Sequence, residues 1–142
     1  MPDPRFPPDK LFRYPHMFPL DIAIWERFLD KYAGDYLGFD YDIKVGTGTI
    51  VPNEWDDNYK RMAEILSKYR IDAVGHKTGR LEIIEVKPEA STVAIGQIVT
   101  YMELYKRDFS PSDTLVGAIV TDREVGDMRL LTKKLEFDYY II

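Results

Sequence analysis

The chain of 142 residues contains no cysteine and only two histidines, His16 and His76. The lack of cysteine excludes disulfide bonds, thiolate metal sites and cysteine nucleophiles, and it is compatible with a reducing, cytoplasmic setting. Two histidines are too few for a histidine-rich zinc site. We therefore expect a cytoplasmic protein without thiol or disulfide chemistry.

Long apolar runs are also missing. No run of 18 apolar residues occurs, so we expect no membrane span, and the start at Met1–Arg5 lacks the apolar core of a secretory signal. At this length, with 45% hydrophobic residues, the chain is expected to form one compact domain with a sizeable core.

The net charge of −5 argues against a general nucleic-acid coat protein, because phosphate binding rewards an excess of Lys and Arg. The distribution of charge is more informative than the total. Between residues 60 and 87 there are seven bases against four acids. This stretch is a candidate for attracting phosphate, and a solvated surface of mixed charge is the alternative interpretation.

A predicted hairpin brings two acids together. Residues 71–76 and 81–87 read as strands, and a two-residue turn at Thr78-Gly79 connects them. Counting back along both strands from this turn places Asp72 directly opposite Glu85. Cross-strand partners on one face have Cβ atoms about 5 Å apart. The two carboxylates are therefore expected to meet.

Lys87 is expected on the same face as Glu85, because side chains alternate along a strand with a period of two. Two carboxylates at this separation repel each other and need a proton or a cation, for which magnesium, manganese or calcium is suited. Solvated charge on an edge strand is the alternative interpretation. The apolar neighbours Ile83, Ile84 and Val86 favour a strand buried on both faces, where charges are rare without a purpose.

Residues 91–109 have the apolar spacing of a helix packed against a sheet. Gln97 and Tyr101 stand four residues apart on one face of this helix, so each needs a buried partner or an opening towards a site. A glutamine satisfied by backbone groups within the core is the alternative.

Together these segments resemble the PD-(D/E)xK nuclease superfamily. The resemblance rests on Arg70-Ile71-Asp72, Glu85-Val86-Lys87 and Gln97-x-x-x-Tyr101, and it extends from Arg70 to roughly Phe109. The nearest pattern is that of RecB-type exonuclease domains and related phage and archaeal nucleases. One departure is Pro88, which requires the strand to end there or to lie at an edge.

The resemblance implies a role for each matched position. Asp72 and Glu85 would hold one or two Mg²⁺ or Mn²⁺ ions, with the Val86 carbonyl as an extra ligand. Lys87 would orient or deprotonate the attacking water. Gln97 would steady Lys87 or a substrate phosphate.

Further roles follow for residues around that motif. Tyr101 would stack or hydrogen-bond near the site. Glu26, in the first predicted helix, is the candidate for the additional glutamate that some members use as a ligand or support. The bases expected to bind the substrate are Arg70, Lys77 and Arg80.

The rest of the chain completes the predicted architecture. Residues 1–19 are rich in proline and aromatic residues and are expected to form an extended arm, whose aromatics lie on the body of the domain or on a second subunit. Residues 20–142 form the single nuclease-like domain. The further predicted elements are a helix at Asp21–Tyr32, an inserted helix at Asn53–Tyr69 with a strand as the alternative, and strands at Tyr36–Val45, Leu115–Val120, Arg129–Leu131 and Phe137–Ile142.

This order predicts an α/β fold with a three-layer core, in which a mixed central sheet is flanked by helices, as in restriction endonucleases. The expected function is a Mg²⁺- or Mn²⁺-dependent deoxyribonuclease with little sequence specificity. DNA is the expected partner, with other DNA-processing proteins or a homo-oligomer, in phage or mobile-element DNA processing. Two alternatives stay open: an inactive nuclease fold that binds DNA or supports assembly, and a small interaction protein whose acids merely form ion pairs.

Overall fold

The computed structural model describes residues 3–142. In chain order the elements are α1 (Pro19–Tyr32), a short 3₁₀ helix (Ala33–Asp35), β1 (Gly38–Val45), α2 (Asp57–Ser67), β2 (Tyr69–Lys77), β3 (Arg80–Glu89), α3 (Thr92–Phe109), β4 (Thr114–Arg123), α4 (Met128–Lys134) and β5 (Asp138–Ile141).

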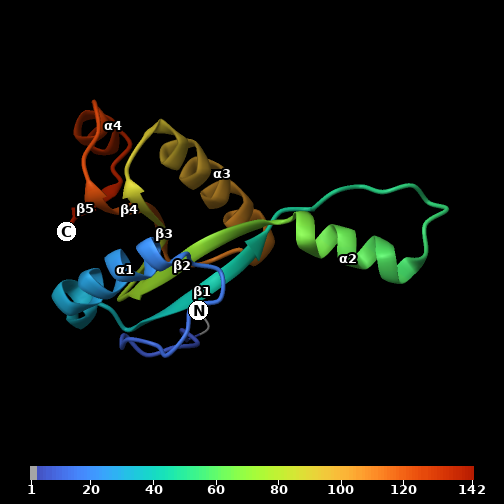
Figure 1. Cartoon of the computed structure of the whole chain (residues 1–142), viewed down its shortest axis with the longest axis horizontal. Helices are drawn as coiled ribbons and strands as arrows, with labels where there is room; N and C mark the ends of the chain where they lie inside the picture. The colour runs from blue at the N-terminus through green and yellow to red at the C-terminus, as the bar shows by residue number, and fades with distance from the viewer. Residues whose placement is uncertain (1–2) are drawn as a thin grey trace.

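The five strands form one sheet in the order β1-β2-β3-β4-β5. β1, β2 and β3 pair antiparallel, whereas β3, β4 and β5 pair parallel. The parallel step from β3 to β4 is made through α3, as a crossover helix allows. α1 covers one face of the sheet and α3 lies on the other (Figure 1). The predicted α/β class, with a mixed sheet between helices, is confirmed.

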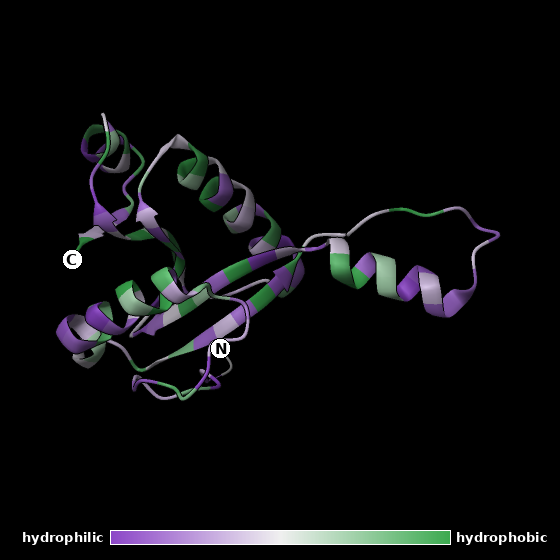
Figure 2. Ribbon diagram, viewed as in Figure 1, coloured by the Kyte–Doolittle hydropathy of each residue, from purple (hydrophilic) through white to green (hydrophobic). Residues whose placement is uncertain are grey.

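Each face of the sheet has its own apolar core. On the α1 face, Trp25 and Phe28 pack with Phe39 and Ile84. On the α3 face the core includes the buried residues Val45, Ile71, Val74, Leu81, Ile83, Tyr101 and Tyr105. Hydrophobic colouring follows the strands of the body and the covering helices (Figure 2). The central strands are thus covered on both sides, which is why they read as nearly continuous apolar runs.

The predicted strand at Arg129–Leu131 is wrong, because these residues lie in helix α4. Met128 and Thr132, one turn apart, are its buried positions. A helix of seven residues shows too little of its 3.6-residue period for the sequence pattern to distinguish it from a strand. The start of the first helix also differs. Phe18 is its N-cap, and Asp21 lies at N3, where its carboxylate accepts the Phe18 N–H at 3.3 Å.

The N-terminal arm lies along the body of the domain. Phe6 forms a β-bridge with Phe39, and Tyr14 and Met17 are buried in the α1-side core. Of the predicted arm, residues 1 and 2 lie outside the described residues. The arm is therefore part of the structure that surrounds the α1 face.

α2 lies apart from these layers, at the end of a long excursion between β1 and β2 (Figure 1). It does not cover the sheet. Across residues 3–142, no helix combines the length and apolar content that crossing a membrane requires.

Candidate functional site

Asp72 lies where the regular pairing of β2 breaks. β1 pairs with β2 at Tyr41↔Ala73 and again at Ile43↔Ile71, with no pair recorded between Asp42 and Asp72. Asp42 has a left-handed backbone, with φ of 52°. Ile71 packs on the α3 face and Ala73 on the α1 face, although alternation would put both on one face. Such irregularities re-aim side chains, and here the affected side chain is the predicted acid.

The Asp72 carboxylate turns towards β3. Its Oδ2 accepts the backbone N–H of Val86 at 2.9 Å. The recorded β2–β3 pairs end at Ala73↔Ile84, so this side chain continues the connection between the strands where the ladder stops. The predicted meeting of Asp72 with the Glu85 region is thus present in the structure, although the carboxylate occupies the gap between strands instead of standing on a flat sheet face.

Glu85 lies beside this gap and is almost fully buried, with 2% of its surface exposed. Its Oε2 lies 3.5 Å from Lys87 Nζ, and its Oε1 is buried without a hydrogen-bond partner among residues 3–142. Two acids and one amine are therefore grouped at the divergence of β2 and β3. A buried carboxylate oxygen with no donor is costly to maintain, so it marks a place for a proton, a water or a cation.

The electrostatics of the two acids reflect this arrangement. Burial and then the negative charge of Asp72 raise the pKa of Glu85, against the opposing effect of Lys87, to about 8. Burial also raises the pKa of Asp72, against the opposing effects of the Val86 N–H and the nearby His16 and Lys87. One ammonium group does not neutralise two buried carboxylates. Either a proton or an added cation compensates the excess negative charge.

Two residues of the N-terminal part of the chain reach the same place. His16 Nε2 lies 3.7 Å from Asp72 Oδ1, and both of its ring nitrogens are buried without a hydrogen-bond partner in the described chain. Asp21, on the first turn of α1, contributes negative charge that acts on Asp72. The sequence pattern did not identify either residue as part of the site. The sequence provides little indication of the position of His16, because a proline-rich arm has no helical or strand periodicity from which the position of a side chain can be predicted.

An open pocket of about 610 Å³ gives solvent access to this group. Its lining residues are His16, Phe18, Pro19, Leu20, Asp21, Asp72, Val86, Lys87 and Pro88. β3 continues past Pro88, but there it is paired on the β4 side, at Lys87↔Thr121 and Glu89↔Arg123. Pro88 therefore lies at a locally open edge, which is one of the two positions that its missing N–H allows.

Gln97 and Tyr101 lie on the α3 side of the same region. They line a separate pocket of about 220 Å³ that also includes Tyr69. Burial, and then the negative charges of Glu85 and Asp72, raise the pKa of Tyr101. The Gln97 side-chain oxygen is buried without a partner in the part of the chain that is described. The helix thus brings Tyr101 near the carboxylates, with Gln97 in the same small pocket, while the main opening lies on the arm side.

The remaining predicted residues lie farther out. Arg70 forms a two-pronged ion pair with Asp42, with Nε and Nη2 at 2.5 and 2.8 Å from its carboxylate oxygens. Lys77 and Arg80 flank the hairpin turn, roughly 16 Å along the strand from Asp72. Glu26 does not line the pocket that contains Asp72 and instead lines two neighbouring pockets beside α1.

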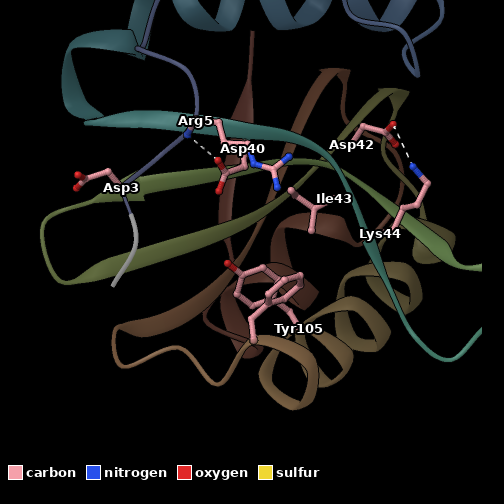
Figure 3. Close-up of a pocket in the computed structure, with 8 residues that line it drawn as sticks. Asp3, Arg5, Asp40, Asp42, Ile43, Lys44 and Tyr105 are labelled. Carbon is pink, nitrogen blue, oxygen red and sulfur yellow. Dashed lines mark hydrogen bonds and ion pairs between the residues drawn. The ribbon is translucent and has the colours of Figure 1, made fainter. Parts of the chain in front are cut away.

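A different pocket, of about 400 Å³, lies along β1 and is drawn in Figure 3. Two of its carboxylates, on Asp40 and Asp42, are already paired. Asp40 accepts the Arg5 backbone N–H at 2.8 Å and lies 2.9 Å from His76 Nε2, and Asp42 is bound by Arg70. His76 is buried at this contact. Because Asp40 and Asp42, the two β1 acids, already have partners, this pocket is a poorer metal site.

The residues around Asp72 and Glu85 fit a hard divalent cation, such as Mg²⁺, that needs only one or two protein carboxylates. Within residues 3–142, no group of three or more His, Cys, Asp or Glu side chains is arranged to hold a metal ion. Mg²⁺ in phosphate-processing sites usually takes one or two carboxylates and completes its shell with water and phosphate oxygens. One buried and one half-buried acid, of which Glu85 has an unpartnered oxygen, lie beside an open pocket and match that requirement.

Comparisons with known proteins were made at three levels. No protein-family model matches the chain, and no curated protein matches it. Among solved structures, the chain is similar to a repair endonuclease from Pyrococcus abyssi, with 14% sequence identity and a TM-score of 0.44. The match covers 72% of this chain and 39% of that chain, so this chain spans well under half of the endonuclease's length. At this level of similarity, the activity of the present chain has to be argued from its own residues.

Proposed function

We propose that the chain is a nuclease that hydrolyses phosphodiester bonds in DNA with the help of Mg²⁺ or Mn²⁺. The observation that carries the proposal is the pair formed by Asp72 and Glu85. Both lie at the divergence of β2 and β3, with Glu85 buried and Asp72 half-buried, the pKa of both is raised, and Glu85 Oε1 has no partner among the described residues. A pair of this kind is stabilised when a divalent cation lies between its oxygens.

In this proposal Asp72 and Glu85 hold the ion, with the Val86 carbonyl as a further oxygen ligand. The Val86 N–H fixes one oxygen of Asp72 at 2.9 Å, which leaves the other free to bind. When bound, such an ion polarises a phosphate and lowers the pKa of a bound water. The local β-strand geometry then determines where both oxygens point.

Lys87 is proposed to orient the attacking water or to stabilise charge on the phosphate. Its ammonium lies 3.5 Å from Glu85 Oε2, and a third of its side chain, 32%, is exposed to the pocket and solvent. An ammonium held at this position donates hydrogen bonds to a phosphate oxygen or to water without needing to move far. His16, on the opposite side of Asp72, is proposed to position that carboxylate.

The substrate class follows from charge and from the absence of a reading element. A phosphate would approach through the open pocket beside Lys87. The chain shows no separate element for reading base edges in residues 3–142, which supports action with little sequence preference. The bases Arg70, Lys77 and Arg80 are proposed to contribute to phosphate attraction at longer range.

The test is a cleavage assay on linear, circular and branched DNA in Mg²⁺ or Mn²⁺, with Glu85→Gln and Lys87→Ala beside the unchanged protein. We expect cleavage that both substitutions abolish and that Glu82→Gln, on the opposite face of the same strand, retains. Equal cleavage by all proteins would indicate contamination. No cleavage on any substrate, together with retained DNA binding, would favour an inactive binding or assembly module.

Calorimetry with Mn²⁺ provides an independent test of the ion. We expect the unchanged protein to bind Mn²⁺ and the Glu85→Gln variant not to bind it. An absence of Mn²⁺ binding in both proteins would favour a cluster of acids that serves only in ion pairs.

A further inference from the structure

The excursion between β1 and β2, residues 46–68, is the part of the molecule whose apolar surface has no cover. We call it the α2 extension. It projects from the body (Figure 1), and α2 has no buried residue when the described chain is considered. The exposed large apolar residues of this region are Ile50, Trp55, Tyr59, Met62, Ile65, Leu66 and, at its base, Tyr69.

The contacts within the α2 extension are too few to explain a stable helix. Asp56 caps α2 by accepting the Asn58 N–H at 2.8 Å, and the Thr49 N–H donates to Ser67 Oγ at 2.5 Å. α2 has 11 residues, and isolated helices shorter than about 12–15 residues are marginal in water. Helices in proteins obtain most of their stability from packing of an apolar face. For α2 the described chain does not supply that packing.

The amount of exposed apolar surface matches a protein interface. Leu66 is 76% exposed and Tyr59 is 67% exposed. With side-chain areas of about 150–250 Å² for the aromatics, the seven residues together present on the order of 800 Å². The largest apolar patch of a typical monomer is about 300–600 Å², whereas a standard interface buries about 800 Å² on each partner. The extension therefore carries roughly one partner's share of an interface.

The spacing of the exposed residues identifies a second helix as a suitable occupant. Tyr59, Met62 and Leu66 follow one another along α2 at intervals of three and four residues. This is the spacing of a seam along which two helices pack side by side with knobs in holes. A helix with the same seam offers matching length and shape, and a copy of this chain provides one.

The charge of the extension favours the same occupant. Residues 50–69 contain four acids and three bases, which are Glu54, Asp56, Asp57 and Glu64 against Lys60, Arg61 and Lys68. A nearly neutral surface gives little attraction to a phosphate backbone. It also allows two copies to approach without strong repulsion. A self-complementary contact of this kind closes into a two-fold dimer.

We propose that the α2 extension is a homodimer interface, in which the seam of α2 packs against the same seam in a second copy of the chain. The buried set is Tyr59, Met62, Ile65 and Leu66, all within α2. The interface lies outside the group around Asp72 and Glu85, so dimerisation and metal-dependent cleavage are separately testable.

Sedimentation equilibrium over a concentration series tests the proposal directly. We expect a dimer for the unchanged full chain, and a weakening of dimerisation on the order of 100-fold or more for the double variant Met62→Glu, Leu66→Glu, because these carboxylates would be buried in the seam. Glu64→Gln, about 200° around the helix from Met62, is the matched control and should dimerise normally. Since α2 buries none of its side chains in the body, circular dichroism and thermal unfolding should show that all variants remain folded.

The absence of cysteine allows a second, covalent test. Met62→Cys should form an oxidised dimer through the seam, whereas Glu64→Cys should remain largely uncrosslinked. A protein that is monomeric throughout the concentration series, or a dimer that survives the double variant and crosslinks equally at both positions, would overturn the proposal. These results do not depend on any cleavage assay.

Discussion

Two buried glutamates on β3 have opposite surroundings. Glu82 lies on the α1 face, where Tyr36 and Tyr140 donate hydrogen bonds to its two oxygens, the second at 2.8 Å, and Lys77 Nζ lies 3.7 Å away. Glu85, on the α3 face, has one oxygen 3.5 Å from Lys87 and another without a partner in residues 3–142. Equal burial therefore does not mean equal role.

The comparison separates a structural carboxylate from a functional candidate. The network around Glu82 is closed by protein groups and connects the hairpin to β5 through Tyr140. The group around Glu85 has one ammonium for two carboxylates and lies beside the pocket that Asp72 and Lys87 line. Satisfied buried polar groups stabilise a fold, whereas an unsatisfied one costs stability and is retained where something else binds. The predictions below test this difference.

The largest expected effect is on cleavage. Glu85→Gln and Asp72→Asn should lower the rate of phosphodiester hydrolysis by about 10³-fold or more, because each removes a charge proposed to hold the ion. Glu82→Gln should retain the rate within roughly threefold. Single-turnover assays with purified, folded variants measure the rates. Equal losses at Glu82 and Glu85 would remove the distinction.

The next effect is on stability, where we expect a large loss at Glu82 and little or none at Glu85. Glu82→Ala should reduce the free energy of unfolding by about 3 kcal/mol, because two buried tyrosine hydroxyls lose their acceptor. Glu85→Gln should leave it unchanged or raise it by about 1 kcal/mol at pH 8, since a buried charge is removed. Urea denaturation monitored by tryptophan fluorescence gives both values. A stability loss in Glu85→Gln as large as that in Glu82→Ala would contradict this pattern.

The pH dependence of stability should distinguish the two glutamates. Burial is the main reason that both glutamates have pKa values above the usual 4.5 in the folded protein. The pKa is about 7 for Glu82 and about 8 for Glu85. The protonated forms are thus favoured in the fold, so this contribution is full below about pH 4.5 and is lost as the pH rises through the folded values. We expect the free energy of unfolding to fall as the pH rises from about 5 to 8.

Mg²⁺ sharpens this prediction. Added Mg²⁺ should restore stability most strongly at about pH 8, where both proposed ligands are ionised, and should have no effect on Glu85→Gln. Thermal unfolding across the pH series, with and without Mg²⁺, measures the change. A Mg²⁺ response that persists in Glu85→Gln but disappears in Glu82→Gln would place the ion beside Glu82, on the α1 face of β3, and would contradict the proposed site.

The smallest expected effect concerns the two histidines. Like the two glutamates, one has a protein partner and the other does not. His76 is held by Asp40 at 2.9 Å, whereas His16 lies 3.7 Å from Asp72 without a hydrogen bond. His16→Ala should lower kcat by about tenfold, because Asp72 loses a neighbour that positions it. His76→Ala should lower stability and leave kcat nearly unchanged. Steady-state kinetics with Mn²⁺ concentration varied measure whether the His16 effect reflects weaker ion binding.

Much of the fold could be predicted because its elements have strong local signals. The Thr78-Gly79 turn, with Lys77 opposite Arg80, fixed the register of the hairpin in advance. The long apolar period of α3 and the apolar run of β4 also determined their own type. α4 was missed, because seven residues do not show a clear period and its identity depends on packing of Met128 and Thr132.

The site was predictable only in part. Asp72, Glu85 and Lys87 could be grouped from strand register, since a period of two and one turn determine which residues are neighbours. His16 and Asp21 could not, because they come from an arm and a helix start whose positions relative to β2 depend on long-range packing. The closed network of Glu82 was equally invisible, since Tyr36 and Tyr140 are distant from it in the chain.

By itself, the sequence determined the hairpin, the helix that follows it and the grouping of two acids with one amine, because turn chemistry and side-chain periodicity act over a few residues. Tertiary structure decided which of the two buried glutamates has an unpartnered oxygen, and it turned Asp72 into the gap between β2 and β3. It also placed His16 beside that carboxylate and left α2 without cover. These features depend on contacts between distant segments, whose free energies no local pattern records.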